Sequence, residues 1–304
     1  MRLMNNLTPD TAAENRVSSE AGDRPGVDSD WNGFELRISD SLFLVHDPSV
    51  EVGKTMGMAK GLFLRCKGYL CAGESAGLGL PVWKTRFRTF FPALVCIKKT
   101  SGRTIEMIMS LERGLAWEIA GMPIPGFFTQ ALECLVAVYA KNTRHQKRML
   151  ALRDMIISLL SVRSKMVQVP GRGLCRVILK ADPAGLLVRV DGSALRGRGR
   201  LIVLNEFEGR IFTRLTDRGQ AWEGADVPGW RLAGSGVCLE SPSLGIEVTI
   251  SQEGEKTIRS GELFCGREVA NSLNWAGIAV MAPAGRIAYH VGIRERKSFS
   301  ENFR

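Results

Sequence analysis

The sequence predicts a mainly β protein, a large antiparallel two-sheet sandwich or the related supersandwich, with a helical insert at about 127–167 and a disordered N-terminal tail. Three observations lead to this prediction. Short alternating apolar runs continue from residue 34 almost to the C-terminal end, and turns separate them at intervals typical of a sandwich or barrel. Residues 127–167 contain no Gly or Pro and are rich in helix-forming residues. Residues 1–32 are polar and acidic, with little apolar surface to bury.

The first half of the chain has the pattern of a β-meander. Residues 34–38 and 42–45 alternate apolar and polar side chains, as strands with one buried face do. Further strand-like runs lie at 62–64, 69–71, 90–97, 104–109 and 115–119. Residues 99–102, Lys-Thr-Ser-Gly, are predicted to form a hairpin turn between two of these strands.

The helical insert is expected to be structural. A single helix over its whole length would be about 60 Å long, so a break near Asn142 is expected. The first piece is apolar on nearly every side, and the second has an apolar face that includes Leu152 and Ile156. The first piece and the apolar face of the second piece are predicted to be buried.

After Pro170 the strand pattern resumes and continues to the end of the chain. The predicted strands are 175–179, 186–190, 201–204, 210–215, 236–240, 246–250, 258–264, 278–281 and 287–293. Residues 33–304 are therefore expected to form a single β-rich domain. At the level of fold only, this plan resembles the large β-sandwiches of the galactose mutarotase and polysaccharide lyase type. No motif in the sequence supports the resemblance further.

The charge of the chain favours anionic partners. Its formal net charge is +10, yet residues 1–33 carry six acidic and three basic residues, which leaves 38 basic against 25 acidic residues in the remainder. A body with this balance attracts nucleic acid, an anionic membrane surface or an acidic sugar without selecting among them.

The seven scattered cysteines are typical of buried, reduced thiols. The chain has only three histidines and lacks a CxxC pair, so no metal site and no cofactor are predicted. The N-terminal residues lack a secretory signal pattern, and the longest apolar run, 134–140, is much shorter than a membrane span. The expected location is cytoplasmic, and the oligomeric state is left open.

The densest mixture of acids, arginines and indoles lies between residues 204 and 230. Glu206 and Glu208 are two residues apart, so on a strand both carboxylates point to the same side. Paired with His290 from a late strand, they would supply two titrating groups of different character for proton transfer on a sugar. We therefore predict Glu206, Glu208 and His290 as catalytic candidates, in a carbohydrate-active or carbohydrate-binding protein for an acidic sugar.

The binding residues expected around this trio supply cations and stacking rings. Arginine side chains orient an acidic ligand, and indoles stack on the apolar face of a sugar. The candidates are Arg210, Arg214, Trp222, Trp230, Lys84 and Arg86. The alternative interpretation of the 204–230 segment is a strand and an exposed loop whose Trp residues anchor the loop in the core.

Two basic segments support a different class of function, a non-enzymatic binding or scaffold protein. Lys84, Arg86 and Arg88 would share one face of a strand, and residues 196–200 read Arg-Gly-Arg-Gly-Arg. Cations of this kind suffice for phosphate contact with nucleic acid or anionic lipid. The simpler interpretation is a solvated strand face and a tight loop before residue 201.

A minor alternative is a serine hydrolase acting through Ser75. Residues 73–77 match the GxSxG pattern of a nucleophile elbow, and His290 lies downstream in the required order. The elbow requires a following helix, whereas residues 78–83 are a poor helix start. Whether the protein is an enzyme is not decided by the sequence.

Overall fold

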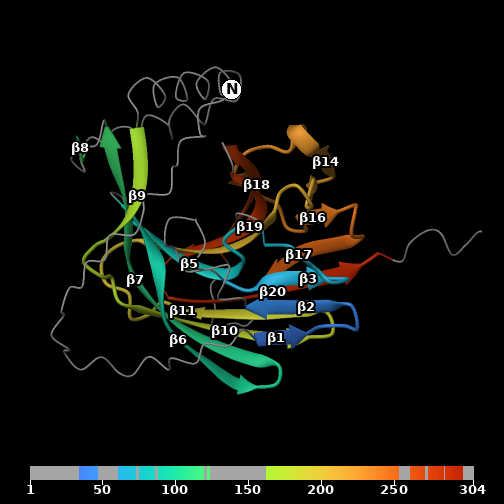
Figure 1. Ribbon diagram of the computed structural model, residues 1–304, viewed down its shortest axis with the longest axis horizontal. Coiled ribbons are helices and arrows are strands. Elements are labelled where there is room, and N and C mark those ends of the chain that lie inside the picture. Colours follow the sequence, from blue (N-terminus) through green and yellow to red (C-terminus); the bar gives the residue numbers. More distant parts are fainter. Residues whose placement is uncertain are drawn as a thin grey trace, which may run out of the picture. The chain divides into compact units, whose positions relative to one another are not determined.

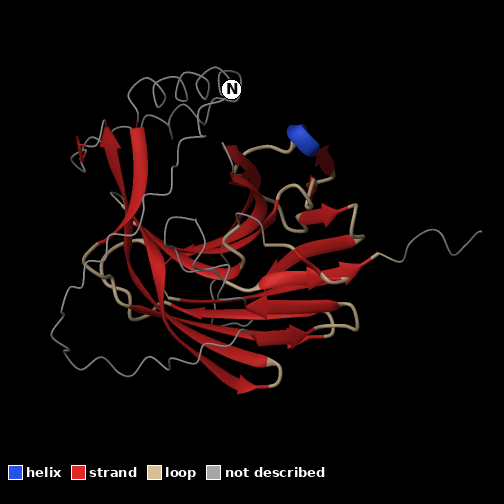
Figure 2. Cartoon of the chain, viewed as in Figure 1, coloured by secondary structure: helices blue, strands red, loops and turns tan. Residues whose placement is uncertain are grey.

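The computed structural model describes residues 34–46, 61–72, 75–85, 88–119, 122–123, 162–252, 261–270, 273–283 and 285–296. In these residues the regular structure is almost entirely β-strand, and the one helical element is the 3-10 turn η1 (Gly224–Asp226) (Figure 2). The prediction of a mainly β protein with large antiparallel sheets is confirmed. None of the helices in the described part of the chain is long and apolar enough to cross a bilayer.

The chain divides into two compact units, Met1–Trp31 with Ala116–Lys165 and Asn32–Leu115 with Met166–Arg304. In the first unit the structure describes the end of β7 (Thr104–Ile119), the short β8 (Met122–Pro123) and the beginning of β9 (Val162–Gln168). Strand β8 pairs with the end of β7.

The predicted helical insert is wrong at its C-terminal end, where residues 162–167 belong to strand β9. Valines lie at both ends of this strand and favour extended structure, which the absence of Gly and Pro concealed. Residues 127–161 of the predicted insert lie outside the described residues, as does the predicted tail at 1–32.

The second unit begins with a four-stranded antiparallel sheet. Its strands are β1 (Phe34–Arg37), β2 (Leu42–His46), β3 (Phe63–Cys66) and β4 (Tyr69–Leu70). A bridge between Leu62 and Leu78 joins this sheet to the start of the next strand, β5 (Leu78–Lys84). All residues of β5 before Lys84 are buried.

The remaining strands follow one hydrogen-bonded order, β14-β13-β16-β17-β20-β11-β10-β7-β6-β5-β12-β19-β18-β15 (Figure 1). Their bounds are β6 (Thr89–Ser101), β10 (Leu174–Asp182), β11 (Gly185–Asp191), β12 (Arg200–Glu208), β13 (Arg214–Asp217), β14 (Gln220–Glu223), β15 (Arg231–Leu232), β16 (Cys238–Ser241), β17 (Ile246–Gln252), β18 (Glu262–Ala270), β19 (Leu273–Pro283) and β20 (Arg286–Glu295). The pairings with assigned registers are all antiparallel, as predicted.

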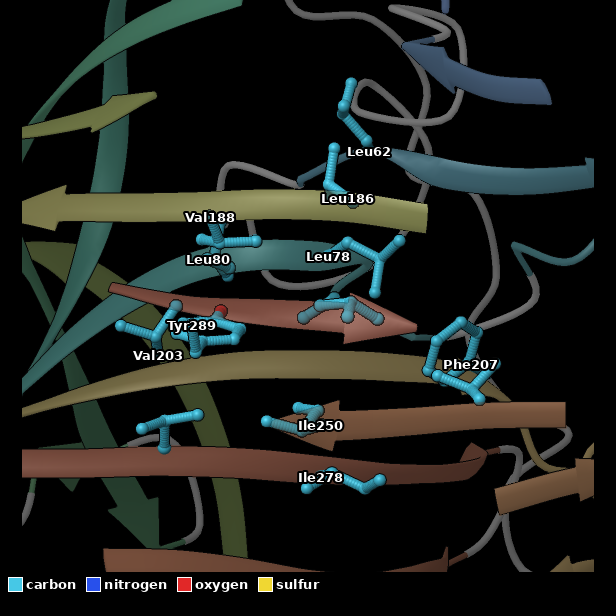
Figure 3. Packing of buried hydrophobic residues seen from close by; sticks show 14 of the residues in the cluster. Leu62, Leu78, Leu80, Leu186, Val188, Val203, Phe207, Ile250, Ile278 and Tyr289 are labelled. Carbon is cyan, nitrogen blue, oxygen red and sulfur yellow. The ribbon is translucent and has the colours of Figure 1, made fainter. Parts of the chain in front are cut away.

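The order turns back on itself at β5 and β6, which pair only through Trp83 with Phe90 and Lys84 with Thr89. As a result β5 and β12 face β10, β11 and β20 across the core. A methyl group placed on Gly79 of β5 would lie 2.9 Å from Leu179 of β10. Figure 3 shows Leu80 of β5, Val188 of β11 and Val203 of β12 near Tyr289 of β20 in the buried core.

One buried polar residue joins the two layers. The Asn205 side chain on β12 accepts hydrogen bonds from the Tyr289 hydroxyl at 2.9 Å and the Gly79 N–H at 3.2 Å. It donates to the Ile278 carbonyl at 3.1 Å. Asn205 and Tyr289 are both fully buried, so the inner faces of β12 and β20 are fixed against each other.

Most predicted strands are present, because a half-buried strand reads directly as apolar and polar alternation. The hairpin predicted at 99–102 connects β6 and β7. Two predictions need correction. Residues 104–109 and 115–119 belong to one strand, β7, and a turn at 209–211 followed by two irregular residues delays β13 until Arg214.

Candidate functional site

The alternation of β12 places the two predicted glutamates on the same face. Leu201, Val203, Asn205 and Phe207 are buried on the inner face, so the even-numbered residues point the other way. Glu206 and Glu208 therefore project from the outer face of the layer that contains β5, β12, β19 and β18. Their surroundings differ, and this separates their roles.

Glu206 is only 6% exposed and holds the chain before β5 in place. Its Oε2 accepts a hydrogen bond from the Ala76 N–H at 2.9 Å, while its own N–H donates to the Gly77 carbonyl. A carboxylate that is covered and bonded in this way supports the backbone that lies over it. This environment favours a structural role for Glu206 over contact with a ligand.

Glu208 is partly exposed and has a phenol as its partner. The Tyr69 hydroxyl, from β4 of the first sheet, donates to Glu208 Oε2 at 3.2 Å. Burial and then the Glu208 charge raise the pKa of the Tyr69 phenol, while the charge of Arg210 acts in the opposite direction. At neutral pH the pair therefore consists of a protonated phenol beside a carboxylate, with a cation nearby.

Two indoles lie beside this pair. Trp275 of β19 is directly opposite Glu208 in the register of β12 and β19, so their side chains share a face. The ring of Trp230 lies 5.5 Å from the ring of Trp275 at an interplanar angle of 47°. Both indoles are partly exposed. We call Tyr69, Glu208, Arg210, Trp230 and Trp275 the Glu208 cluster.

A rigid arginine and amide pair adjoins the cluster. Arg267 donates two hydrogen bonds to Asn274 Oδ1, at 3.1 and 3.0 Å, and burial lowers the pKa of its guanidinium. The backbone carbonyl of Asn274, the residue before Trp275, accepts from the Gly209 N–H at 2.8 Å. These bonds hold the backbone beside Trp275 and Glu208 in place.

His290 is not brought to the glutamates. Its neighbour Tyr289 points inward to Asn205, so His290 points to the outer face of the opposite layer. There its Nε2 lies 3.1 Å from Asp182 Oδ2 at the β10–β11 hairpin. Because Glu206 and Glu208 project from the far side of the other layer, the predicted pairing of His290 with a glutamate is not formed.

Arg214 and Trp222 each contact a charged residue outside the predicted catalytic trio. Arg214 lies 3.8 Å from the buried carboxylate of Glu240, which Arg296 approaches to 3.0 Å. The guanidinium of Arg231 lies 3.9 Å above the ring of Trp222. Arg214 thus pairs with Glu240 between β13 and β16, whereas Trp222 contacts Arg231, the residue that follows Trp230 in the chain.

Lys84 lies at the other end of β12 from Glu208. It is opposite Arg200, the first residue of β12, so eight strand residues, about 26 Å, separate that point from Glu208. The predicted Arg86 lies outside the described residues. Lys84 therefore does not join the Glu208 cluster.

The structure does not support Ser75 as a nucleophile. Its side chain is fully buried and its hydroxyl donates to the Ala72 carbonyl. The next element is strand β5 rather than the helix that a nucleophile elbow requires. The glycine pattern instead serves the turn, since Gly77 has φ of +78°.

Sequence reasoning missed Tyr69 and Trp275 as members of the cluster. Tyr69 is separated from Glu208 by 139 positions, and Trp275 lies in β19 (Leu273–Pro283), of which the sequence predicts only residues 278–281 as a strand. The available local signal for Tyr69 is a tyrosine that begins a short strand next to Gly68, and it is a weak one.

No protein-family model and no curated protein sequence matches this chain. Among solved structures it is similar to a Glycoside Hydrolase Family 97 enzyme from Pseudoalteromonas sp. strain K8 in complex with acarbose, at 10% identity over 87% of this chain and 34% of that chain, with a TM-score of 0.40. It is also similar to a galactose mutarotase-like protein from Lactobacillus casei ATCC 334, at 9% identity over 86% of this chain and 100% of that chain, with a TM-score of 0.40.

The chain spans about a third of the length of the first of these proteins. At such identities and TM-scores, the likeness assigns no activity to it. The structure itself defines the class, a mainly β protein of large antiparallel sheets that carries a carboxylate, a phenol and paired indoles on one sheet face.

Proposed function

We propose that the protein binds a saccharide at the Glu208 cluster and that the ligand is an acidic sugar. The observation that carries this proposal is the hydrogen bond between Tyr69 and Glu208 beside the Trp230 and Trp275 rings. Indoles provide flat apolar surfaces that stack on sugar rings, while a carboxylate and a phenol bind hydroxyl groups. Arg210 supplies the cation that an acidic sugar requires.

The same pair can also move protons. Glu208 is the acceptor and Tyr69, whose pKa is raised, keeps its proton at neutral pH and is the donor. A sugar hydroxyl bound beside both oxygens, which lie 3.2 Å apart, would give its proton to Glu208 and receive one from Tyr69. This assignment replaces His290 with Tyr69 as the partner of the carboxylate.

Removal of the indole or of the carboxylate is expected to weaken saccharide binding. Trp275→Ala should lower the affinity for an oligogalacturonate roughly tenfold or more, because it removes the stacking surface, and Glu208→Gln should lower the affinity for maltotriose, a neutral sugar whose hydroxyl groups donate to the carboxylate. Calorimetry on the full chain measures this change. His290→Ala is the matched control, since His290 lies on the opposite layer, and it should leave the affinity unchanged.

Two further variants separate specificity from proton transfer. Arg210→Gln should weaken binding of the oligogalacturonate but not of a neutral oligosaccharide such as maltotriose. Tyr69→Phe should keep the affinity within about twofold and lose any turnover, because it retains the ring and removes only the proton donor. If no saccharide binds, or if the His290 control loses as much affinity as Trp275→Ala, the proposal is wrong.

A further inference from the structure

The two basic segments noted in the sequence lie together at the end of β12 that is remote from Glu208. Lys84 ends β5, Arg200 begins β12, and the two residues are directly opposite each other. Thr85, the residue after Lys84, bonds to Arg88, because its hydroxyl accepts a hydrogen bond from the Arg88 N–H at 3.0 Å. Since opposed residues of antiparallel strands are about 5 Å apart, the cations of the two segments share one edge.

A third segment brings Arg172 to the same edge. The Arg172 guanidinium lies 4.6 Å from the centre of the Phe90 ring, and Phe90 is two residues after Arg88. The Arg172 carbonyl accepts a hydrogen bond from the Arg196 N–H at 2.7 Å. Arg172 is therefore attached to both basic segments at once.

Two glycines allow residues 196–200 to lie directly on the core. A methyl group placed on Gly199 would be 2.6 Å from the indole of Trp83, which is fully buried. Gly197 adopts φ of +92° and lies close to the guanidinium of Arg172. The backbone thus follows the surface closely while Arg196 and Arg198 remain exposed. We call the combined set the basic corner: Lys84, Arg88, Arg172, Arg196, Arg198 and Arg200.

The basic corner has more cations than nearby carboxylates. Arg200 is 3.5 Å from the exposed Glu262, and Glu112 lies close to Gly171. The Nε of Arg172 is buried and has no hydrogen-bond partner among the described residues. Several arginines elsewhere on the described strands pair with a carboxylate, as Arg176 does with Glu106 at 2.7 Å.

We propose that the basic corner binds the phosphate backbone of a nucleic acid. Five of its six cations are arginines, whose planar donors match phosphate oxygens in pairs. Lys84 and Arg200 are opposed strand residues about 5 Å apart, and Arg172, Arg196 and Arg198 lie in the segments beside them, a density of cations that suits the charge of a nucleic acid, about one per 1.7 Å of duplex. Among the described residues of the corner, the aromatic rings of Trp83 and Phe90 are buried and offer no surface for stacking on bases. Recognition is therefore independent of base sequence.

A membrane surface fits the basic corner less well. Peripheral membrane binding adds an apolar face to the cations. The segments that the structure describes at the corner expose one large apolar side chain, Leu174, rather than such a face. The proposal also stands apart from saccharide binding, because the two sites lie at opposite ends of β12.

Fluorescence anisotropy on the full chain with a labelled DNA duplex of about 20 base pairs tests the proposal. Contacts with about five phosphates predict that the logarithm of the binding constant falls with the logarithm of salt concentration with a slope of about −4 to −5, measured between about 50 and 200 mM salt. Arg196→Gln with Arg198→Gln should make this slope shallower by about 2 and weaken binding at least about tenfold at the low salt concentration.

The matched control also removes two positive charges, but from arginines that each pair with a carboxylate. Arg65→Gln with Arg176→Gln takes away two arginines that bond to Glu35 and Glu106, and it should change the affinity by no more than about twofold. Circular dichroism and thermal unfolding confirm that each variant is folded. The proposal is overturned if the duplex does not bind at about 50 mM salt or if the control loses as much affinity as the Arg196 and Arg198 variant.

Two other outcomes would assign the corner to a different partner and so also reject the proposal. One is binding of a polygalacturonate in place of the duplex, with loss in the Arg196 and Arg198 variant. The other is binding of vesicles with about one fifth phosphatidylserine but not of the duplex. Saccharide binding at the Glu208 cluster is measured with different variants, so either proposal can fail while the other stands.

Discussion

Asn205→Ala is expected to lower the free energy of unfolding by about 4 kcal/mol. The side chain makes three buried hydrogen bonds, to Tyr289, Gly79 and the Ile278 carbonyl. Its loss leaves two donors and one acceptor without partners in the core and also creates a cavity. Chemical denaturation of the variant and of the parent protein, analysed as a cooperative transition, measures the difference.

Tyr289→Phe provides the graded comparison for this prediction. It removes one of the three bonds and leaves the ring in place, so a loss of about 1 to 2 kcal/mol is expected. Burial raises the pKa of the Tyr289 phenol, which therefore remains a hydrogen-bond donor at ordinary pH. The double variant should lose less unfolding free energy than the two single variants lose together, because both single changes break the same hydrogen bond. A loss below about 1 kcal/mol for Asn205→Ala would show that the layers do not depend on this residue.

Asn205 also determines the position of the Glu208 cluster. With its side chain fixed toward Tyr289, strand alternation turns Glu206 and Glu208 to the other face of β12. The same bond fixes Tyr289 inward and His290 outward on β20. One contact across the core therefore accounts for the separation of Glu208 from His290.

The sequence was sufficient for the elements and insufficient for their arrangement. Alternation with a period of two residues is a local property, so most strands and the shared face of Glu206 and Glu208 could be predicted. Which strand lies opposite which is a property of the whole chain. The partners Tyr69 for Glu208 and Asp182 for His290 are 139 and 108 positions away, and no local pattern indicates either.

For the basic segments, too, the sequence predicts the local structure but not the long-range contacts. The 196–200 run is predicted to be a tight loop before residue 201; residues 196–199 lie between β11 and β12, and Arg200 is the first residue of β12. That this loop would meet Lys84 and Arg172 could not be read from spacing, because the pairing of β5 with β12 joins segments far apart in the chain.

Gly185→Ala is expected to cost about 3 to 5 kcal/mol of unfolding free energy. Gly185 begins β11 directly opposite Gly292 of β20, with φ of +146°. A methyl group there would lie 2.0 Å from the Val291 carbonyl oxygen, a backbone atom that cannot move without disturbing the β11–β20 pairing. The cost combines an unfavourable backbone conformation with a steric clash inside the sheet.

Gly285→Ala is the matched control, because it separates these two contributions. Gly285 has nearly the same φ, +142°, and nothing lies within 4 Å of the added methyl group. It should therefore show the conformational cost alone, about 1 to 2 kcal/mol. The difference between the two variants in denaturant unfolding measures the close approach of β11 to β20. Equal losses would mean that β20 does not lie against Gly185, and the placement of His290 beside Asp182 at the same hairpin would then be wrong as well.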